Sequence, residues 1–445
     1  MRPRDGCEDA DARSRGGVTI ETAAPLTLTG ASQILRPPQN GLTRLAGNRA
    51  GELTLEPGDL TLADGVIVGF EPDAGSVRVR CDGCAIVPGF VDAHTHLPFV
   101  GWRAEEYAMK LGGVPYEEIA RAGGGIRSTA RSFARATDEA VLSQSRELAD
   151  EMLRHGTTTF EGKSGYGLSM DGELRALALG DALADQVLQR TVSTALLAHA
   201  VPDGLSASEW MDQVAGVVGR VVAETSARAL DIFVEAIAFD HDALRRMGTL
   251  ARDHGLALRT HVEQLSTMGS VPVAIGAGAR SVDHLACMPV EDVAALAEAD
   301  CAAVLLPGAE FIGDEHLPPA RALIDAGAIC VLASDLNPGT SPVTSLPLII
   351  GLAARRYRWT IREALLAVTL NAAWVLECSD VVGSLEPGKR ADVVLLDGPV
   401  EQIPYRFGHN PVAAVIVGGR PAWIRPDQAW RFASLPPAQR EAGGR

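Results

Sequence analysis

The stretch that decides the fold is AIVPGFVDAHTHLP, residues 85–98. It starts as an apolar run, breaks at Pro88-Gly89, and ends in two histidines separated by one residue. Because alternate side chains of a β-strand share one face, His94 and His96 are expected to point the same way. Two imidazoles on one face at a strand end can bind one divalent metal ion. Taken alone, the pair is explained equally well as two polar residues at the mouth of a buried strand.

The rest of the chain supplies a repeating pattern of apolar runs and helical segments. Together with residues 86–96, the apolar runs lie at 157–163, 191–201, 230–239, 256–265, 281–287, 301–308 and 329–337. Helical segments such as 138–155 and 242–254 lie between them, and 371–376 is expected to be the last barrel helix. Eight such units predict an α/β fold, a closed (β/α)8 TIM-like barrel over residues 86–380.

Both ends of the chain carry short β-like runs rather than this alternation. Asp64-Gly65 between two apolar runs is a hairpin signal, and further β-like pieces lie at 382–397 and 413–420. We therefore expect a small, discontinuous β-sandwich domain built from residues 18–85 and 381–430. Residues 1–17 are expected to form a disordered tail.

Charge and hydropathy exclude several classes of function. The 445 residues include 47% hydrophobic ones, enough for a full core. Lys and Arg number 40 against 56 Asp and Glu, and the net charge of −16 argues against a nucleic-acid or anionic membrane partner. No apolar run approaches the roughly 18 residues that a membrane span needs, and the N-terminus lacks the apolar core of a signal peptide.

The seven cysteines are scattered along the chain. Their scatter predicts a reducing, cytoplasmic compartment without a disulfide framework. Cys81 and Cys84 form a single CxxC pair, and without the second pair of a zinc ribbon they are expected to lie in an ordinary turn.

Polar residues gather at the carboxyl ends of the predicted barrel strands, where barrel active sites lie. Each has a plainer explanation when taken alone: a rim histidine, a turn residue for Asp335, or an ion pair with an interior Arg or Lys for Glu235. Together, polar residues at so many equivalent positions favour an active site. In chain order they are His94, His96, Lys163, Tyr166, His199, Glu235, His261, Gln264, His284 and Asp335.

Four of these residues form a plausible ligand set. His94, His96, His261 and Asp335 offer three nitrogen donors and one carboxylate, which suits Zn²⁺ or Fe²⁺ with an open position for water. Metal binding lowers the pKa of such a water toward about 7. Asp335 can accept a proton from that water, and His284 can hydrogen-bond the hydroxide or carry the proton.

The chain resembles the amidohydrolase superfamily and, more narrowly, the imidazolonepropionase family, hydrolases of histidine degradation. The matching motifs span most of the chain, and the AGGGI, KSGYGL and SDLNPG stretches are more specific than the histidine pair. They are HTHLPFVGWRAEEY (94–107), YEEIARAGGGIRST (116–129), KSGYGL (163–168), AHAVP (198–202), THVEQLS (260–266), DHL (283–285), VLLPGAEF (304–311), SDLNPGTSP (334–342), SLEPGKRADVVLLD (384–397) and IPYRFGHNPVAAVI (403–416).

The resemblance implies a reaction and a set of contacts. The reaction is hydrolysis of the ring amide C–N bond of 4-imidazolone-5-propanoate by a metal-activated water, giving N-formimidoyl-L-glutamate. One divalent ion would be bound by His94, His96, His261 and Asp335. Arg103 would grip the carboxylate of this small anionic heterocycle, with backbone N–H groups after the eighth strand as further anion donors. The remaining implied contacts are Tyr116, Tyr166, His199, Gln264 and Thr340 to the substrate, and Asn337 and Gly339 to the product. Barrels of this type often pair, so we expect a homodimer.

Departures from the family pattern bear on the substrate more than on the metal. Pro98 and Trp102 alter the loop after the metal-binding strand, and Ile237 replaces a small residue. Gln264 stands where some members have Glu; a neutral amide can orient the ring but cannot act as a base, which leaves His284 or Asp335. The alternatives are a related amidohydrolase or deaminase acting on another small heterocycle, and an inactive barrel used for binding. The complete ligand set counts against the second.

Overall fold

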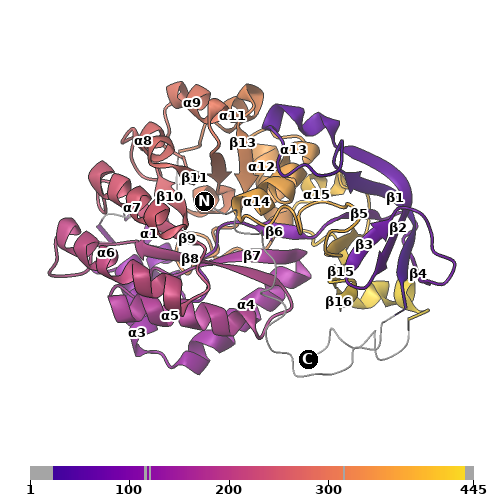
Figure 1. Ribbon diagram of the computed structural model, residues 1–445, viewed down its shortest axis with the longest axis horizontal. Helices are drawn as coiled ribbons and strands as arrows, with labels where there is room; N and C mark the ends of the chain where they lie inside the picture. Colours follow the sequence, from indigo (N-terminus) through magenta and orange to yellow (C-terminus); the bar gives the residue numbers. More distant parts are fainter. Residues whose placement is uncertain (1–23, 115–117, 120–121, 314–315, 436–445) are drawn as a thin grey trace.

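The computed structural model describes residues 24–114, 118–119, 122–313 and 316–435. The predicted tail, residues 1–17, and Tyr116 lie outside the described residues. Figure 1 shows a barrel of strands ringed by helices, beside a sheet whose indigo and yellow strands come from the two ends of the chain.

Eight parallel strands form the barrel, and each pairs with its neighbour along the chain. Beyond the strand ends, the Asp335 N–H donates to the His94 carbonyl (3.0 Å) and the His96 N–H donates to the Leu336 carbonyl (2.9 Å). These bonds join the first and last strands at the carboxyl end, which confirms the predicted (β/α)8 architecture. The strands are β6 (Phe90–Asp92), β7 (Thr157–Lys163), β8 (Arg190–Ala198), β9 (Ala229–Val234), β10 (Ala257–Val262), β11 (Ala279–His284), β12 (Ala302–Leu305) and β13 (Ile329–Leu332).

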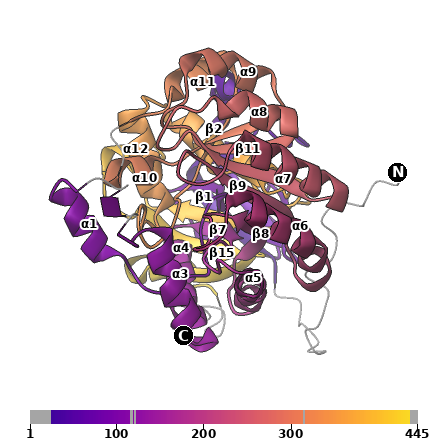
Figure 2. The ribbon, with the colours of Figure 1, turned by 90° about the vertical axis from the view of Figure 1, so that its left-hand side faces the viewer.

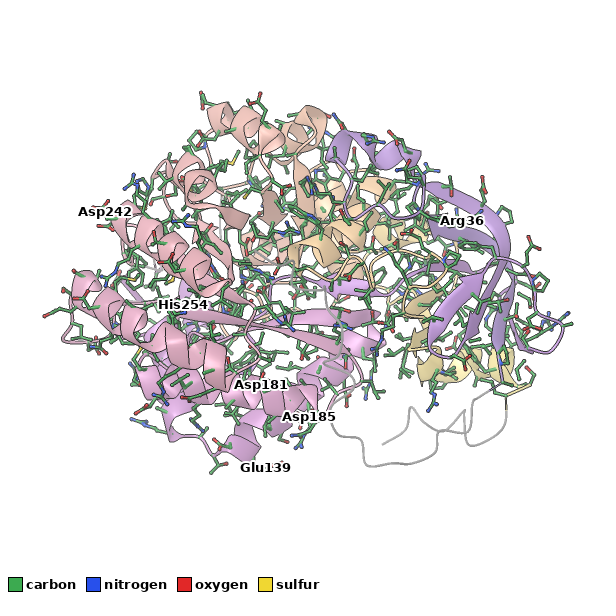
Figure 3. All side chains as sticks on the ribbon, viewed as in Figure 1. Arg36, Glu139, Asp181, Asp185, Asp242 and His254 are labelled. Atoms are coloured by element: carbon green, nitrogen blue, oxygen red, sulfur yellow. The ribbon has the colours of Figure 1, made fainter. Side chains whose placement is uncertain are left out.

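Helices cover the outside of the barrel, as the end-on view in Figure 2 shows. The two that the sequence predicts most clearly are α4 (Asp138–Arg154) and α7 (His241–His254). The Asp240 side chain caps α7 by accepting from two backbone N–H groups, and Gly255 ends it with a φ of 67°, a conformation that favours glycine. Charged side chains of α4 and α7, such as Glu139 and Asp242, lie on the outside of the molecule (Figure 3).

Further α-helices are α1 (Ala104–Leu111), α3 (Ile126–Arg135), α5 (Met170–Ala184), α6 (Ala207–Glu224), α8 (Ser270–Ala277), α9 (Val293–Glu298), α10 (Pro307–Ile312), α11 (Ala320–Ala326), α12 (Leu346–Arg356), α13 (Ile361–Ala367), α14 (Leu370–Val375) and α15 (Gln402–Tyr405). Short 3-10 helices lie at Gly47–Glu52, Val290–Asp292 and Pro426–Phe432. Helix α14 matches the predicted last barrel helix. Among the described residues, no helix combines the length and the apolarity that crossing a bilayer requires.

The second sheet combines strands from both ends of the chain and fits the predicted small β-sandwich. Its order is β16-β15-β14-β5-β1-β2-β3, and β4 pairs with β1. Asp64 and Gly65 have φ values of 50° and 82°, as expected for the predicted hairpin. Its strands are β1 (Leu26–Arg36), β2 (Thr54–Ala63), β3 (Val66–Gly69), β4 (Val77–Arg80), β5 (Ala85–Pro88), β14 (Val393–Leu396), β15 (Val412–Val417) and β16 (Arg420–Ile424). The Cys84 N–H donates to the Cys81 carbonyl (2.9 Å), so this pair forms the expected turn.

The predicted first barrel strand, residues 86–96, is wrong at its start. Residues 85–88 form β5, which pairs with β1 and β14 in the small sheet, and only Phe90–Asp92 belongs to the barrel. The chain crosses between the sheets at Gly89, where a Cβ would lie 2.0 Å from the Thr158 hydroxyl oxygen. A side chain does not fit at this crossing, so the Pro-Gly break marks a change of sheet rather than a kink within one strand.

Candidate metal centre and active site

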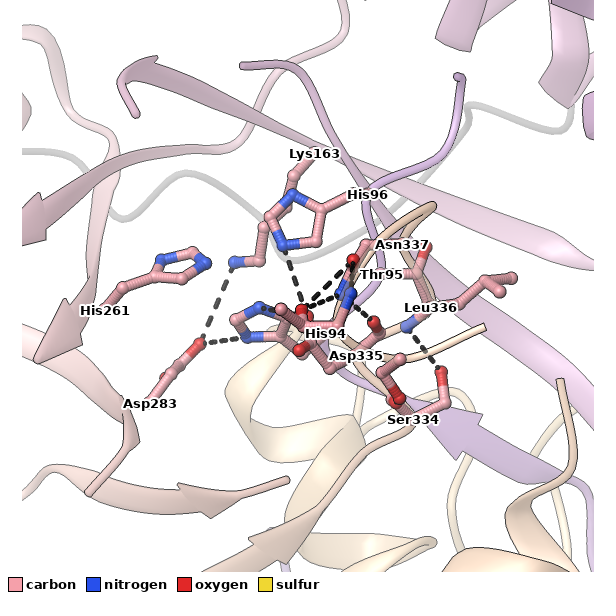
Figure 4. Close-up of polar contacts among 12 residues, drawn as sticks. His94, Thr95, His96, Lys163, His261, Asp283, Ser334, Asp335, Leu336 and Asn337 are labelled. Atoms are coloured by element: carbon pink, nitrogen blue, oxygen red, sulfur yellow. Dashed lines mark hydrogen bonds and ion pairs between the residues drawn. The ribbon is translucent and has the colours of Figure 1, made fainter. Parts of the chain in front are cut away.

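Five buried side chains converge at the carboxyl end of the barrel: His94, His96, His261, His284 and Asp335. The Asp335 carboxylate oxygen Oδ1 lies 3.3 Å from His96 Nε2 and 3.5 Å from His94 Nε2. The His94 and His261 ring centroids are 4.5 Å apart, and those of His261 and His284 are 5.3 Å apart. Figure 4 shows His94, His96, His261 and Asp335 of this cluster.

The cluster fits a divalent metal ion. Nε2 of His94, Nε2 of His261 and both Asp335 oxygens are buried without a hydrogen-bond partner among the described residues. Potential ligand atoms in the sets His94, His96, His261 and His94, His284, Asp335 lie within 4.8 Å of one another. Burial holds the pKa of His94 and His96 well below the usual range, so both rings are neutral donors. Burial also raises the pKa of Asp335 to about 7, because its charge lacks solvation there. A cation bound among these atoms would supply the missing interactions.

Two aspartates fix the orientation of two of these histidines. His94 Nδ1 lies 2.6 Å from an Asp283 carboxylate oxygen, and His261 Nδ1 lies 3.1 Å from an Asp231 oxygen. A carboxylate accepts, so Nδ1 of each ring carries the proton and Nε2 presents its lone pair to the centre.

Both aspartates belong to a layer of buried charged residues beneath the candidate metal centre. We call Glu161, Lys163, Asp231, Arg259 and Asp283 the charge layer; all are at most 1% exposed. The Lys163 Nζ lies 2.7 Å from Asp231 and 3.0 Å from Glu161, and Arg259 pairs with Glu161. The same Nζ lies 3.8 Å from Asp283, a contact that Figure 4 shows. Burial opposes the Lys163 charge, but the three carboxylates raise its pKa above the ordinary value. Burial likewise opposes the Asp231 charge, yet His261 and Lys163 lower its pKa.

Of the charge layer, only Lys163 was predicted, as a polar residue at a strand end. The other four residues were not singled out. The available signal was charge at alternating positions inside apolar strands, as in Glu161 and Lys163, which share one face of β7.

The pocket above the centre brings together most of the predicted contact residues. Trp102 and Ile237 are about half exposed, at 49% and 51%, and neither they nor Pro98 are among the lining residues. These three departures from the family pattern therefore lie outside the pocket lining. The lining residues are His96, Arg103, Lys110, Ile126, Tyr166, His199, Phe233, His261, Gln264, Leu265, His284, Asp335, Asn337 and Thr340. Lys110, Ile126, Phe233 and Leu265 were not predicted.

His199 is held in one tautomer at the pocket wall. Its Nδ1 lies 3.0 Å from the Gly165 carbonyl oxygen, so Nδ1 carries the proton and Nε2 is an acceptor. The ring stacks on His96, with centroids 5.1 Å apart and planes 16° apart. Burial lowers the pKa of His199 well below the usual range, which keeps the ring neutral.

Glu235 holds a turn in place, a role that differs from both interpretations of the sequence, the active-site residue and the ion-pair partner. It follows β9 and accepts hydrogen bonds from the Leu265 N–H (3.1 Å), the Ser266 N–H (3.1 Å) and the Ser266 hydroxyl (2.7 Å). The predicted ion pair with an interior Arg or Lys is not what holds it. Glu235 instead anchors the turn that carries Gln264 into the pocket.

The backbone after β13 is organised by Asn337. Its side-chain oxygen accepts the N–H groups of Gly339 (2.9 Å) and Thr340 (2.8 Å), and its amide donates to the Asp335 carbonyl (2.7 Å). The expectation that these N–H groups serve as anion donors is therefore wrong for Gly339 and Thr340, because both are already bonded within the loop.

Arg103 lies directly on Gly339. A Cβ added to Gly339 would sit 1.4 Å from the Arg103 Nη2 atom, so the guanidinium occupies the space of the missing side chain. Arg103 is 9% exposed, and its buried Nη1 has no hydrogen-bond partner among the described residues. Its Nε lies 3.6 Å from the Glu106 carboxylate.

Gly339→Ala is expected to displace the Arg103 guanidinium and leave the metal centre intact. If Arg103 grips an anionic substrate, loss of that charge-assisted contact should raise KM by about 10- to 100-fold with little change in kcat. Steady-state kinetics measure this, and Gly216→Ala is the matched control, since a Cβ there meets nothing within 4 Å. An unchanged KM in a folded Gly339→Ala protein would show that the guanidinium position does not matter for binding.

Comparison with known proteins agrees with this geometry. The amidohydrolase family model matches residues 85–422. The chain is 42% identical over 378 residues to an imidazolonepropionase of Stenotrophomonas maltophilia, covering 82% of this chain and 92% of that protein. It is 44% identical over 352 residues to an imidazolonepropionase of Rubrobacter xylanophilus, covering 78% of this chain and 84% of that protein.

Solved structures with the same fold are more distant in sequence. A triazine hydrolase from Arthobacter aurescens aligns with a TM-score of 0.68 at 18% identity, over 93% of this chain and 100% of that one. An adenosine deaminase from Xanthomonas campestris with bound zinc aligns with a TM-score of 0.64 at 19% identity, over 90% of this chain and 93% of that one. These structures support the fold, whereas the closer sequences decide the family. The chain belongs to the amidohydrolase family and, within it, to the imidazolonepropionases.

Proposed function

We propose that this protein hydrolyses the ring amide C–N bond of 4-imidazolone-5-propanoate to N-formimidoyl-L-glutamate in histidine degradation. The relatives named imidazolonepropionase support this proposal. The observation that carries it is the pairing, in one pocket, of a buried guanidinium with a cluster suited to a divalent metal. A small heterocycle with a carboxylate tail is complementary to both.

The side chains divide the work of binding. Arg103 takes the substrate carboxylate in a bidentate contact, because its nitrogen Nη1 is buried and has no hydrogen-bond partner in the part of the chain that the structure describes. His199 offers its Nε2 lone pair to a ring N–H, and Tyr166 and Gln264 orient the ring from the pocket wall. Asn337 holds Gly339 and Thr340 in place, and Gly339 supports Arg103.

The metal proposal is one Zn²⁺ or Fe²⁺ per chain, bound by His94, His96, His261 and Asp335. Bound there, the ion would polarise the ring carbonyl and lower the pKa of a water. Asp335 accepts the proton of the attacking water, since its carboxylate oxygens face the centre. His284, whose buried ring lies 5.3 Å from that of His261, relays the proton to the leaving ring nitrogen.

Following the ultraviolet absorbance of freshly generated 4-imidazolone-5-propanoate tests the proposal. We expect the absorbance to decay in the presence of the metal-loaded protein, with N-formimidoyl-L-glutamate as the product by mass spectrometry and no release of ammonia. Ammonia release from this or another heterocycle would favour the related deaminase reaction. A metal-loaded, folded protein that leaves the imidazolone unchanged would overturn the substrate assignment.

We further propose a cytoplasmic location. The six described cysteines carry thiols rather than disulfides, which suits a reducing compartment.

A further inference from the structure

The loop between β7 and α5 places Tyr166 in the pocket, and a buried glutamate holds this loop. Glu173, in the first turn of α5, is 1% exposed. Its carboxylate accepts hydrogen bonds from the backbone N–H groups of Gly165 (2.7 Å), Gly167 (2.7 Å) and Leu168 (2.9 Å). We call residues 164–168 the tyrosine loop.

The tyrosine loop packs closely against α5 and His199. A Cβ on Gly167 would lie 2.2 Å from the Gly172 carbonyl carbon, so the loop backbone rests on the start of α5. A Cβ on Gly165, whose φ is +119°, would lie 2.7 Å from His199 Nδ1. Loss of the Glu173 oxygens would leave the N–H groups of Gly165, Gly167 and Leu168 without these partners, and unpaired backbone donors in a buried loop are costly.

Two pocket residues depend on the position of this loop. The Gly165 carbonyl accepts the His199 Nδ1 proton and so leaves His199 Nε2 as an acceptor. Tyr166 is the residue between Gly165 and Gly167; it is 3% exposed, and its ring centroid is 5.4 Å from that of His199. Glu173 itself is not among the pocket-lining residues, so its effect on a bound molecule has to act through the loop.

We propose that Glu173 is a positioning residue for substrate binding: its carboxylate fixes the tyrosine loop and thereby sets the place of Tyr166 and the tautomer of His199. This proposal rests on the proposed function, in which both residues contact the imidazolone ring.

Glu173→Gln tests the proposal with little change of shape. A glutamine amide has one acceptor oxygen, so its NH₂ group faces at least one of the loop N–H donors. We expect KM for the imidazolone to rise by about 10- to 100-fold, the fold-change that corresponds to one lost charge-assisted hydrogen bond. The kcat and metal content should change little. Glu173→Asp keeps both acceptor oxygens and should recover part of the loss.

Amide hydrogen exchange of the peptide spanning residues 163–169 gives a second readout that needs no substrate. The loop amides should exchange faster in Glu173→Gln than in the unsubstituted protein, with Glu173→Asp between them. Glu209→Gln is the matched control: Glu209 also stands in the first turn of a barrel helix and accepts a backbone N–H, that of Ser206 (2.8 Å), but Ser206 does not line the pocket.

The outcomes separate this proposal from the proposed function. The positioning role would be overturned if folded Glu173→Gln showed unchanged amide exchange and an unchanged KM. It would also be overturned if kcat and thermal stability fell while KM stayed constant. If the unsubstituted protein does not consume the imidazolone, the proposed function fails, and loop exchange still decides whether Glu173 fixes the loop. If Glu173→Gln does not fold, amide exchange and KM are measured on Glu173→Asp instead. Values equal to those of the unsubstituted protein would then count against the positioning role.

Discussion

Asp335→Asn is expected to lower kcat for the imidazolone by about a thousandfold or more, within the range for loss of a general base combined with loss of a metal ligand. The amide cannot accept the proton of the attacking water and is a weaker ligand than a carboxylate. The backbone should tolerate the change, because Asp335 has a φ of 53° and asparagine readily adopts this conformation. Steady-state kinetics under saturating metal, with circular dichroism to verify the fold, measure the effect.

Asp240→Asn is the matched control for this substitution. Asp240 caps α7 through two backbone N–H groups, a role that asparagine also performs well. Its activity should match that of the unsubstituted protein. If Asp335→Asn retained a tenth or more of the activity with a full metal complement, Asp335 would not be the proton acceptor.

Lys163→Met is expected to weaken metal binding and to destabilise the barrel by about 3–5 kcal/mol, the range for removing one partner from a buried ion pair. Lys163 is fully buried and is the cation closest to both Asp231 and Asp283 among the contacts described above. Without Lys163, these two carboxylates lose the positive charge that compensates them. Metal binding should weaken because Asp231 orients His261 and Asp283 orients His94. Urea unfolding and metal content after dialysis against a chelator measure the two effects.

Lys389→Met separates the metal effect from the general cost of losing a buried cation. Lys389 is also buried, lies 3.0 Å from Glu386 and donates to the Ser379 carbonyl (2.7 Å) near the small sheet. This control should lose stability but keep its metal. Equal metal retention by both variants would contradict a role for Lys163 in orienting the ligands.

The barrel could be predicted from the sequence because its signals are local. Alternating apolar runs and helical segments give eight strands, and the cap and terminal glycine of α7 define a helix within a residue of the predicted one. The junction at Gly89 could not be predicted, because Ile86 and Val87 are equally apolar in either sheet. Their assignment to the small sheet comes from the pairing of β5 with β1 and with β14, which is more than 300 residues away in the chain.

The candidate ligands could be predicted, whereas their support could not. His94, His96, His261 and Asp335 all stand out in the sequence as polar residues at the carboxyl ends of predicted barrel strands. Glu173 looks like an ordinary helix glutamate, and Glu235 like one more polar residue at a strand end. Their roles depend on which backbone N–H groups the fold brings to their carboxylates, and this information is in the tertiary structure alone.

The most direct test of metal-dependent hydrolysis at this site is a metal titration of chelator-stripped protein, with imidazolone turnover as the readout. Zn²⁺ is added in one series and Fe²⁺, without oxygen, in another. Activity should be absent in the stripped protein and rise linearly to a plateau at one equivalent per chain with at least one of the two ions. Full activity in the metal-free protein, or a plateau only at two equivalents, would contradict a single-metal centre formed by His94, His96, His261 and Asp335.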